Sequence, residues 1–320
     1  MYHSILLWDM CDLYNLANST DLLSLQQRKV KWKQVIECAL NWLRAILHPD
    51  GEIPFFNDSA FGIAPIFADI ANYASQLGII TKNVVKEGFS CIWLRQSGYC
   101  SVILGEQSKA IIDIAKIGPD YQPGHGHADT LSFELSIYGH RFLVNSGISR
   151  YEDGLQRQFE RSTQAHNTLT INGENSSEVW SSFRVARRAY PENIVVEQRE
   201  DNIFIAGSHN GFKRLSGCNT HRREWTFHTN KLNMRDIILG SYNEVESRLY
   251  FHPDIRVNII DEGLVQCSII GSQFVFIKIM GYLQLDIENT FWYPKLGVKL
   301  ANHCLRIKLN GPELLTEIKW

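Results

Sequence analysis

The sequence predicts an α+β chain in which a short α-helical region is followed by a large antiparallel β-sandwich. Apolar residues recur with a helical period up to about Gly78, and with a period of two after about Gly88. The short alternating runs are separated by Gly, Asn, Asp and Pro without intervening helices, which is typical of antiparallel sheets. We therefore expect a helical segment over residues 1–87 and a sandwich over residues 88–320, with a boundary near residues 82–88.

The N-terminal region is expected to contain three helices. Apolar stripes predict the first two, over residues 6–17 and residues 35–48. The second should end at the Pro49-Asp50-Gly51 segment, because this composition breaks helices. A third helix is expected over residues 64–77, with Gly78 at the position of a C-terminal cap. Three tryptophans follow the helical spacing and are expected in the core: Trp8, Trp32 and Trp42.

The second region begins its clearest alternation at residues 131–137, where apolar and polar residues predict a half-buried strand. Tyr138-Gly139-His140 is a plausible turn into a second strand over residues 141–144. Similar runs recur up to the C-terminus, at residues 202–207, 223–228, 274–279 and 305–309.

Composition excludes several classes of protein. The 320 residues contain 32 Lys and Arg against 34 Asp and Glu, so the net charge of −2 gives no electrostatic reason to expect a nucleic acid or an anionic membrane as partner. No apolar run approaches the roughly 20 residues that span a bilayer. The seven cysteines are scattered without a Cys-x-x-Cys pair, which argues against a disulfide framework or a thiolate zinc site. The first residues lack the pattern of a secretion signal.

The densest polar cluster is Gly124-His125-Gly126-His127-Ala128-Asp129. Two histidines at i and i+2 project to one side of an extended chain, and glycines allow a ligand to approach the backbone. The cluster indicates either a metal site or a general base, and the alternative is an exposed loop. A cupin metal motif is disfavoured, because Glu134 follows the second histidine at too great a distance.

Three further segments carry candidate binding residues. Residues 161–168 combine Arg161, His166 and Asn167 and suit an acidic, hydroxyl-rich ligand, or else form a strand-entry turn. Arg184 lies in a basic run that suits carboxylates or sulfates, or else forms a solvated strand edge. The loop before residue 60 places Asn57 and Asp58 beside aromatic residues, as on a sugar-facing surface or in a helix-capping segment.

Taken in order, these clusters resemble the heparinase II/III-like polysaccharide lyases. The matching stretches are GHGHADTLSFELSIYGHRFLVNSG, RSTQAHNTLTINGENSSEVW and FRVARRA. The segment MYHSILLWDMCDLYNL is similar to a late helix of the family's incomplete (α/α) toroid, and HPDGEIPFFNDSA is similar to the loop after it. The resemblance implies that residues 1–87 are a remnant of the toroid and that residues 88–320 are the family's β-sandwich domain.

The resemblance also implies a reaction, which is β-elimination on a uronic-acid-containing polysaccharide. A base removes the proton at C5 of the sugar and the bond from C4 to oxygen breaks, while the enzyme stabilises the enolate-like intermediate. A Tyr and a His share the acid and base roles in the family, and their positions match Tyr2 and His125. We expect five residues to contact the substrate: Asn57, Asp58, Arg161, Asn167 and Arg184.

A structural zinc ion in some family members implies metal ligands at His127, Asn145 and His166. Asn145 stands where the family usually has Asp, and a neutral amide is a poor zinc ligand. A hairpin turning at Gly139 would also place Asn145 opposite Phe133, away from His127. The family's carboxylate-neutralising Asn or His has no matching residue in this chain.

The expected function is therefore that of a lyase acting on an acidic polysaccharide, in the periplasm or outside the cell. Heparan, alginate and bacterial exopolysaccharide stay open as substrates. The alternative is a truncated, non-catalytic glycan-binding or scaffold remnant of such a lyase. Because Tyr2 lies at the beginning of this chain, where a helix end frays, we expect the chain by itself to be weakly active or inactive.

Overall fold

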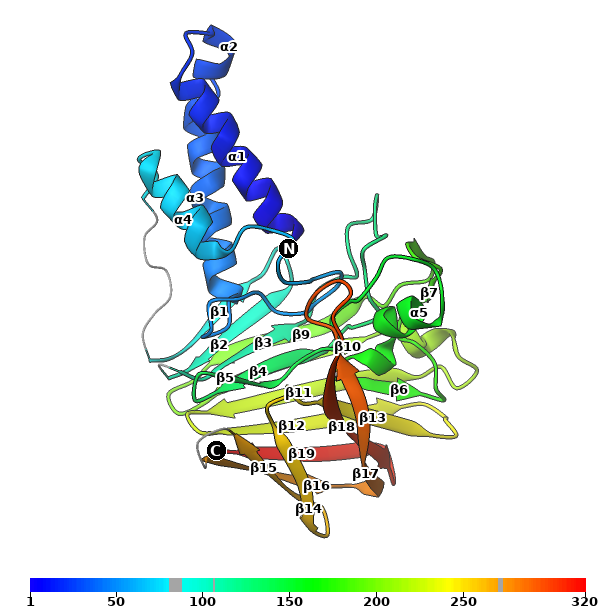
Figure 1. Ribbon diagram of the computed structural model, residues 1–320. Coiled ribbons are helices and arrows are strands. Elements are labelled where there is room, and N and C mark those ends of the chain that lie inside the picture. Colours follow the sequence, from blue (N-terminus) through cyan, green and yellow to red (C-terminus); the bar gives the residue numbers. More distant parts are fainter. Residues whose placement is uncertain (81–87, 106, 270–272) are drawn as a thin grey trace.

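The structure is a computed structural model that describes residues 1–80, 88–105, 107–269 and 273–320. A helical arm stands on one end of a layered body of antiparallel sheets (Figure 1). This arrangement confirms the predicted fold class. The predicted boundary near residues 82–88 lies almost entirely outside the described residues.

The arm contains four helices, which are α1 (Tyr2–Asn18), α2 (Leu23–Gln26), α3 (Lys29–Ile46) and α4 (Phe67–Gln76). The helix predicted to reach residue 48 ends at Ile46, and the one predicted from residue 64 begins at Phe67, just after Pro65 and Ile66. Gly78 adopts a φ of 73°, as a C-terminal cap requires. The apolar faces of α1, α3 and α4 form one cluster, against which the three tryptophans pack while only partly buried.

The strands of the described residues form four sheets, in which every named pairing is antiparallel. The five-stranded sheet contains β1 (Phe89–Leu94), β2 (Tyr99–Leu104), β3 (Lys109–Asp113), β4 (Phe133–Ile137) and β5 (His140–Leu143), in that order. The four-stranded sheet has the order β17 (Tyr282–Trp292), β18 (Leu300–Leu309), β13 (Val245–Tyr250) and β6 (Leu169–Ile171). A short ribbon pairs β7 (Val179–Trp180) with β8 (Arg184–Val185).

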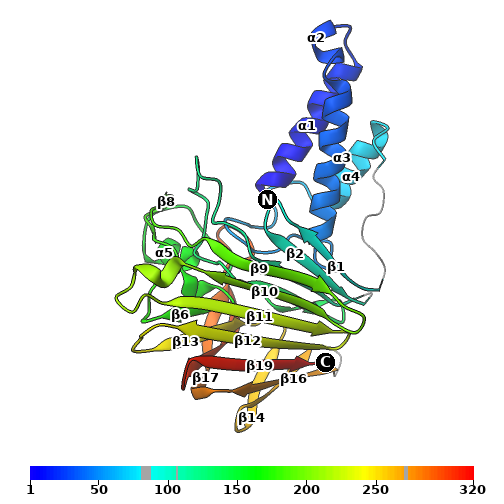
Figure 2. The same cartoon turned by 180° about the vertical axis from the view of Figure 1, so that it is seen from behind.

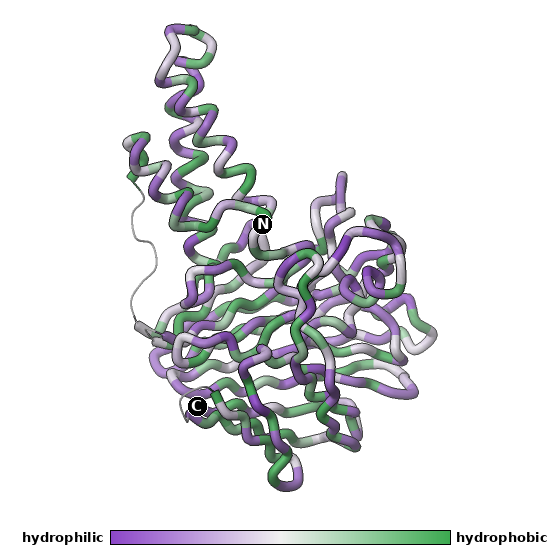
Figure 3. Tube along the Cα trace, in the orientation of Figure 1, coloured by the Kyte–Doolittle hydropathy of each residue, from purple (hydrophilic) through white to green (hydrophobic). Residues whose placement is uncertain are grey.

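The largest sheet has eight strands, and Figure 2 shows it from behind, with β9 nearest the arm. Its order is β14 (Arg256–Asp261), β15 (Leu264–Ile269), β16 (Gln273–Met280), β19 (Glu313–Lys319), β12 (Lys231–Leu239), β11 (Thr220–His228), β10 (Ile203–His209) and β9 (Pro191–Gln198). Hydrophobic and hydrophilic residues alternate along these strands (Figure 3). In β11 every second residue is buried, as the period of two predicts. One apolar core joins the five-, eight- and four-stranded sheets.

One prediction about the sheets is wrong, because β4 is buried on both faces and not half-buried. Its polar face is covered by the segment that leaves α3. His48 contacts the Glu134 carboxylate through Nε2 at 2.9 Å and the Ser136 hydroxyl through Nδ1 at 2.7 Å. The backbone N–H groups of Phe55 and Asn145 donate to the other oxygen of Glu134. Alternation in β4 therefore separates an apolar core from a buried polar layer, and not from water.

The turn between β4 and β5 is as predicted. Tyr138 and Gly139 both have positive φ values, 55° and 82°, which a two-residue hairpin with the right-handed strand twist requires. The irregular segments carry α5 (Leu155–Arg161) and two 3₁₀ turns, at Thr163–Ala165 and Gly211–Arg214.

The arm is attached to the five-stranded sheet by buried polar contacts. The Lys109 ammonium donates to the backbone carbonyls of Ala45 and Leu47 at the C-terminus of α3, at 2.8 and 2.6 Å. Trp42 Nε1 donates to Ser97 at 2.9 Å. These contacts fix α3, and through it the beginning of α1, at the edge of the sandwich. No described helix is long and apolar enough to cross a membrane.

Candidate active site

A cleft of about 180 Å³ lies where the arm meets the sandwich. The beginning of α1, the end of α3, the loop over residues 53–59 and the segment around His125 supply its walls. Tyr2, Trp42, Asn57, Tyr99 and His125 all line it. Tertiary packing thus brings two of the predicted clusters, separated by more than 60 residues, to one place.

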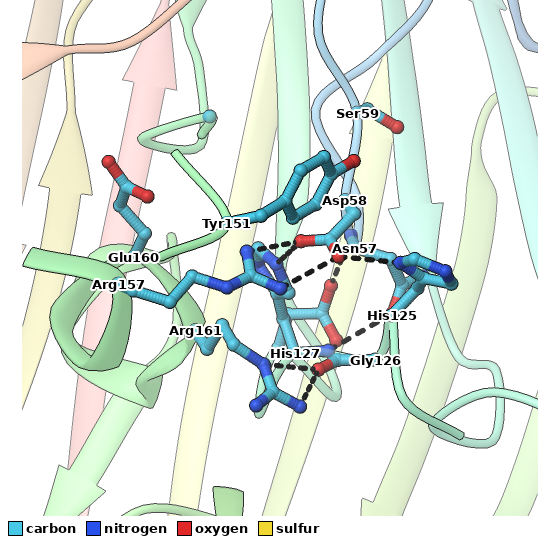
Figure 4. Close-up of polar contacts among 12 residues, drawn as sticks. Asn57, Asp58, Ser59, His125, Gly126, His127, Tyr151, Arg157, Glu160 and Arg161 are labelled. Carbon is cyan, nitrogen blue, oxygen red and sulfur yellow. Dashed lines mark hydrogen bonds and ion pairs between the residues drawn. The ribbon is translucent and has the colours of Figure 1, made fainter. Parts of the chain in front are cut away.

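Asp58 is the centre of the polar network beside this cleft (Figure 4). Nδ1 of His125 and Nε2 of His127 each donate to one carboxylate oxygen at 2.8 Å. The Arg157 guanidinium donates to both oxygens. Burial by itself would raise the pKa of Asp58, but the hydrogen bonds from these three side chains outweigh it and hold the pKa well below its usual range. Asp58 is therefore a buried, ionised carboxylate.

This finding corrects the expectation that Asp58 contacts substrate. Its side chain is buried and both oxygens are already occupied by protein donors. The carboxylate orients His125, which is a positioning role. Arg157 was not identified from the sequence, where one Arg in a helix carries no distinguishing signal.

His125 has the geometry of a proton acceptor. A carboxylate can only accept hydrogen bonds, so Nδ1 of His125 carries the ring proton and Nε2 has the lone pair. Nε2 has no hydrogen-bond partner among the described residues, and the side chain is 40% exposed. A Cβ on the next residue, Gly126, would lie 2.6 Å from Ile117, so glycine allows the loop to pack closely.

Tyr2 lies directly beside His125. Their ring centroids are 4.5 Å apart, and Tyr2 is 44% exposed. The Tyr2 hydroxyl is 3.0 Å from the hydroxyl of Tyr151, a residue that sequence reasoning missed. Phe183 is a further aromatic neighbour, and its ring centroid lies 5.5 Å from that of His125. Tyr151 and Phe183 flank predicted clusters, but nothing in their spacing indicates that they meet His125.

Two of the expected substrate contacts, Arg161 and Asn167, are buried. The Arg161 guanidinium donates to the backbone carbonyls of Gly126 and Ser181, at 3.0 Å each. Asn167 donates to the carbonyl of Phe133 at 2.8 Å and accepts from the N–H of Tyr250 at 2.7 Å. The burial of both side chains argues against direct contact with substrate, and Arg161 instead holds the loop that carries His125.

The other two expected contacts lie nearer to solvent. Asn57 lines the cleft, where its Nδ2 donates to the Tyr99 hydroxyl at 3.2 Å and its Oδ1 accepts from the His127 N–H at 3.2 Å. Its positive φ of 54° is one that Asn tolerates better than most residues. Arg184 is exposed on β8, directly after Phe183. Contact of Asn57 or Arg184 with a substrate stays a prediction.

The expected zinc ligands His127 and His166 form a buried pair. Nε2 of His127 faces the Asp58 carboxylate, and Nδ1 of His166 faces the Ser162 carbonyl at 2.7 Å. Both partners are acceptors, so these nitrogens carry the ring protons. The remaining nitrogens, 3.2 Å apart, therefore present lone pairs to each other. Burial lowers the pKa of both rings, that of His166 to about 3, so neither is readily protonated.

This arrangement fits a bound cation. Two Zn–N bonds of about 2.0–2.1 Å at a tetrahedral angle separate the nitrogens by about 3.4 Å, and metal-binding histidines are usually held by such acceptors. Asn145 is the third candidate, although its Oδ1 already accepts from the N–H of Asn167 at 3.0 Å. Within the described ranges, no group of three or more His, Cys, Asp or Glu side chains is placed to hold a metal. A zinc ion here stays a prediction.

Comparisons with known proteins concern the family and the fold of the chain. The family model described as heparinase II/III-like, C-terminal, matches residues 88–320. The chain is similar to the structure of a heparinase III, with a TM-score of 0.77 and 15% identity over 99% of this chain and 51% of that one. It is also similar to the heparan sulfate lyase HepC from Pedobacter heparinus, with a TM-score of 0.76 and 16% identity over 99% and 51%.

At these identities the likeness to solved structures concerns the fold, and the chain spans about half the length of those two proteins. No curated protein matches the chain. The family model is a stronger finding, because it covers well over half of the chain and includes the segments of both histidine clusters. This protein therefore belongs to the heparinase II/III-like family.

Proposed function

We propose that this protein is a polysaccharide lyase that cleaves an acidic, uronic-acid-containing polysaccharide by β-elimination. The observation that carries the proposal is the pairing of Tyr2 with His125. Their rings lie 4.5 Å apart on the wall of one cleft, and the His125 ring is oriented by a buried carboxylate. The Tyr2 hydroxyl is a proton donor beside the His125 imidazole, which is a proton acceptor, and both lie within reach of a single sugar residue.

In the proposed reaction, Nε2 of His125 accepts the C5 proton of the uronate. The electron pair of the C5–H bond forms the C4–C5 double bond, and the C4–O bond breaks. The Tyr2 hydroxyl donates its proton to the departing oxygen, and both groups then exchange protons with solvent. Asp58 stabilises the imidazolium that forms, because it remains ionised beside it.

The other side chains of the network keep this geometry. Arg157 balances the charge of Asp58, and Arg161 holds the backbone on the C-terminal side of His125. We propose that His127 and His166, with Asn145 as third candidate, hold a zinc ion. Such an ion would supply a fixed positive charge that joins the two loops, which is a structural role.

One observation favours a second candidate, a protein that binds acidic glycans without cleaving them. The described residues that line the cleft include no Lys or Arg. Elimination requires a group that neutralises the uronate carboxylate, and the side-chain amide among the described lining residues is that of Asn57. Its amide already bonds to Tyr99 and His127.

The test is incubation of the purified chain with a panel of acidic polysaccharides, including heparan sulfate and alginate. The unsaturated uronate product is followed by its ultraviolet absorbance. A lyase gives rising absorbance, which Tyr2→Phe and His125→Ala should slow strongly. The control His140→Ala, which alters an exposed histidine at the beginning of β5, should keep the wild-type rate. Binding of a glycan without any absorbance change would favour the second candidate and contradict the lyase proposal.

A further inference from the structure

A second, larger pocket opens next to the cleft, with a volume of about 510 Å³. Its walls come from the β1–β2 turn and from the segment that follows β3. Trp93, Arg95 and Lys116 are among the side chains that line it. The pocket has no part in the acid and base chemistry proposed above, and its size suits one sugar residue or more.

The pocket and the cleft share two lining residues. Asn57 and Tyr99 line both spaces, and the Asn57 amide donates to the Tyr99 hydroxyl at 3.2 Å. This pair forms the partition between the two. A polymer that places one residue at His125 can therefore extend its next residues over the partition and into the larger pocket.

The charge of the pocket is positive. Arg95 and Lys116 are its charged lining residues in the described part of the chain, and no Asp or Glu is found among the lining side chains there. Both cations are exposed, and neither has a carboxylate within 4 Å among the described residues. Asp120, the acid of the adjoining segment, is paired with Arg188 at 2.9 Å. Two cations without counter-charge favour an anionic ligand.

The pocket also offers an aromatic surface and a rigid floor. Trp93 is 36% exposed, and the Arg95 guanidinium lies 5.2 Å from the centre of its ring. An indole beside a cation suits a sugar that has an apolar ring face and an anionic substituent. The floor is tightly packed, because a Cβ at Gly98 would lie 2.4 Å from the Cα of Ala115. The Gly98 carbonyl also accepts the N–H of Ile114 at 2.9 Å.

We propose that this pocket is a subsite for an anionic sugar residue of the polysaccharide, adjacent to the residue that reacts at His125. Arg95 and Lys116 pair with a carboxylate or sulfate group, and Trp93 packs against the ring. This inference rests on the proposed function for the identity of the polymer. It adds the requirement that the polymer be charged at a second position, beyond the reacting uronate.

The test compares the double variant Arg95→Gln/Lys116→Gln with the matched control Arg256→Gln/Lys278→Gln. The control removes two exposed cations from β14 and β16, which lie far from the arm in Figure 1. Dissociation constants are measured by calorimetry at low and high salt, with heparan sulfate, chemically desulfated heparan sulfate and alginate oligosaccharides as probes. Because all four side chains are exposed, thermal unfolding should be unchanged in both variants.

The double variant is expected to bind roughly 10- to 100-fold more weakly at low salt and to show a weaker salt dependence, whereas the control binds like wild type. Loss confined to the sulfated probe assigns the subsite to sulfate, and loss with every probe assigns it to carboxylate. The same variant should raise KM for long chains and leave kcat nearly unchanged.

The results separate the subsite from the lyase reaction. Product formation with binding and KM insensitive to the double variant overturns the subsite and leaves the lyase standing. Binding that depends on Arg95 and Lys116 without any unsaturated product supports the subsite and contradicts the lyase. Failure of the wild-type chain to bind any of the three probes overturns the subsite.

Discussion

Replacing Asp58 by Asn tests whether one buried carboxylate holds the candidate site together. The carboxylate accepts hydrogen bonds from His125, His127 and both terminal nitrogens of Arg157. An amide has one oxygen, and its NH₂ group would face donors that it cannot satisfy. Both imidazoles can change tautomer to accept a hydrogen bond, but the guanidinium cannot. Asp58→Asn therefore leaves Arg157 as a buried cation without its counter-charge.

The size of the effect follows from burial. Arg157 and Asp58 are both buried, and removal of one partner from such an ion pair costs about 3–5 kcal/mol. That is a large share of the roughly 5–15 kcal/mol by which native proteins are stable. For a chain of 320 residues, the expected fall in the unfolding midpoint is roughly 4–8 °C.

The assay is thermal unfolding followed by circular dichroism, with Asp286→Asn as the control. Asp286 forms an ion pair of the same kind with Arg306 at 2.9 Å, but both side chains are about one-third exposed. Such exposed pairs contribute less than about 1 kcal/mol. An Asp58→Asn protein that unfolds at the temperature of the Asp286→Asn control would refute the central role of Asp58.

The same variant has a characteristic pH dependence. The pKa of Asp58 in the folded protein lies well below its usual range, so its stabilisation is present above the unfolded pKa of about 3.9 and is lost as the pH falls toward the folded value. The difference in unfolding free energy between wild type and Asp58→Asn should be constant from pH 7 to about 5. Below about pH 4 it should shrink by roughly 1.4 kcal/mol per pH unit. A difference that grows on acidification would contradict the assignment.

His125→Ala should reduce lyase turnover by roughly 10²–10⁴-fold, the usual contribution of a positioned proton-transfer group, with an unfolding midpoint close to wild type because the other hydrogen bonds of Asp58 remain. Wild-type steady-state rates in this variant would exclude His125 as the base. Arg161→Met should lower the midpoint by several degrees, because it removes the donors that hold the His125 loop; calorimetry on Arg161→Lys, which keeps the charge, should give a smaller loss. Elemental analysis after purification with added zinc should find less than one zinc per chain in wild type and more in Asn145→Asp, because a carboxylate is the better ligand. Equal zinc contents in the two proteins would oppose the assignment of residue 145 as a zinc ligand.

The periodicity of the sequence was sufficient to predict the fold class. A helical stripe or a strict alternation reports which face of an element is apolar, and this depends on backbone geometry alone. The hairpin was also predictable from local sequence, because Gly139 readily adopts the positive φ that such a turn requires. The burial of β4 was not, since a sequence does not say whether a polar face will meet water or, as at Glu134, a second layer of the same chain.

The candidate site likewise has features that the sequence indicated and features that only the tertiary structure shows. The residue types at His125, His127 and His166, together with the family resemblance, indicated where chemistry could occur. Their roles depended on contacts between distant segments, such as Asp58 with His125 and Tyr2 with Tyr151. A polar side chain has several possible partners of similar local energy, and only tertiary packing selects among them by burying some and leaving others in solvent. For that reason the sequence by itself determined the fold class and the neighbourhood of the site, whereas the tertiary structure decided which residues face the cleft and which hold it in place.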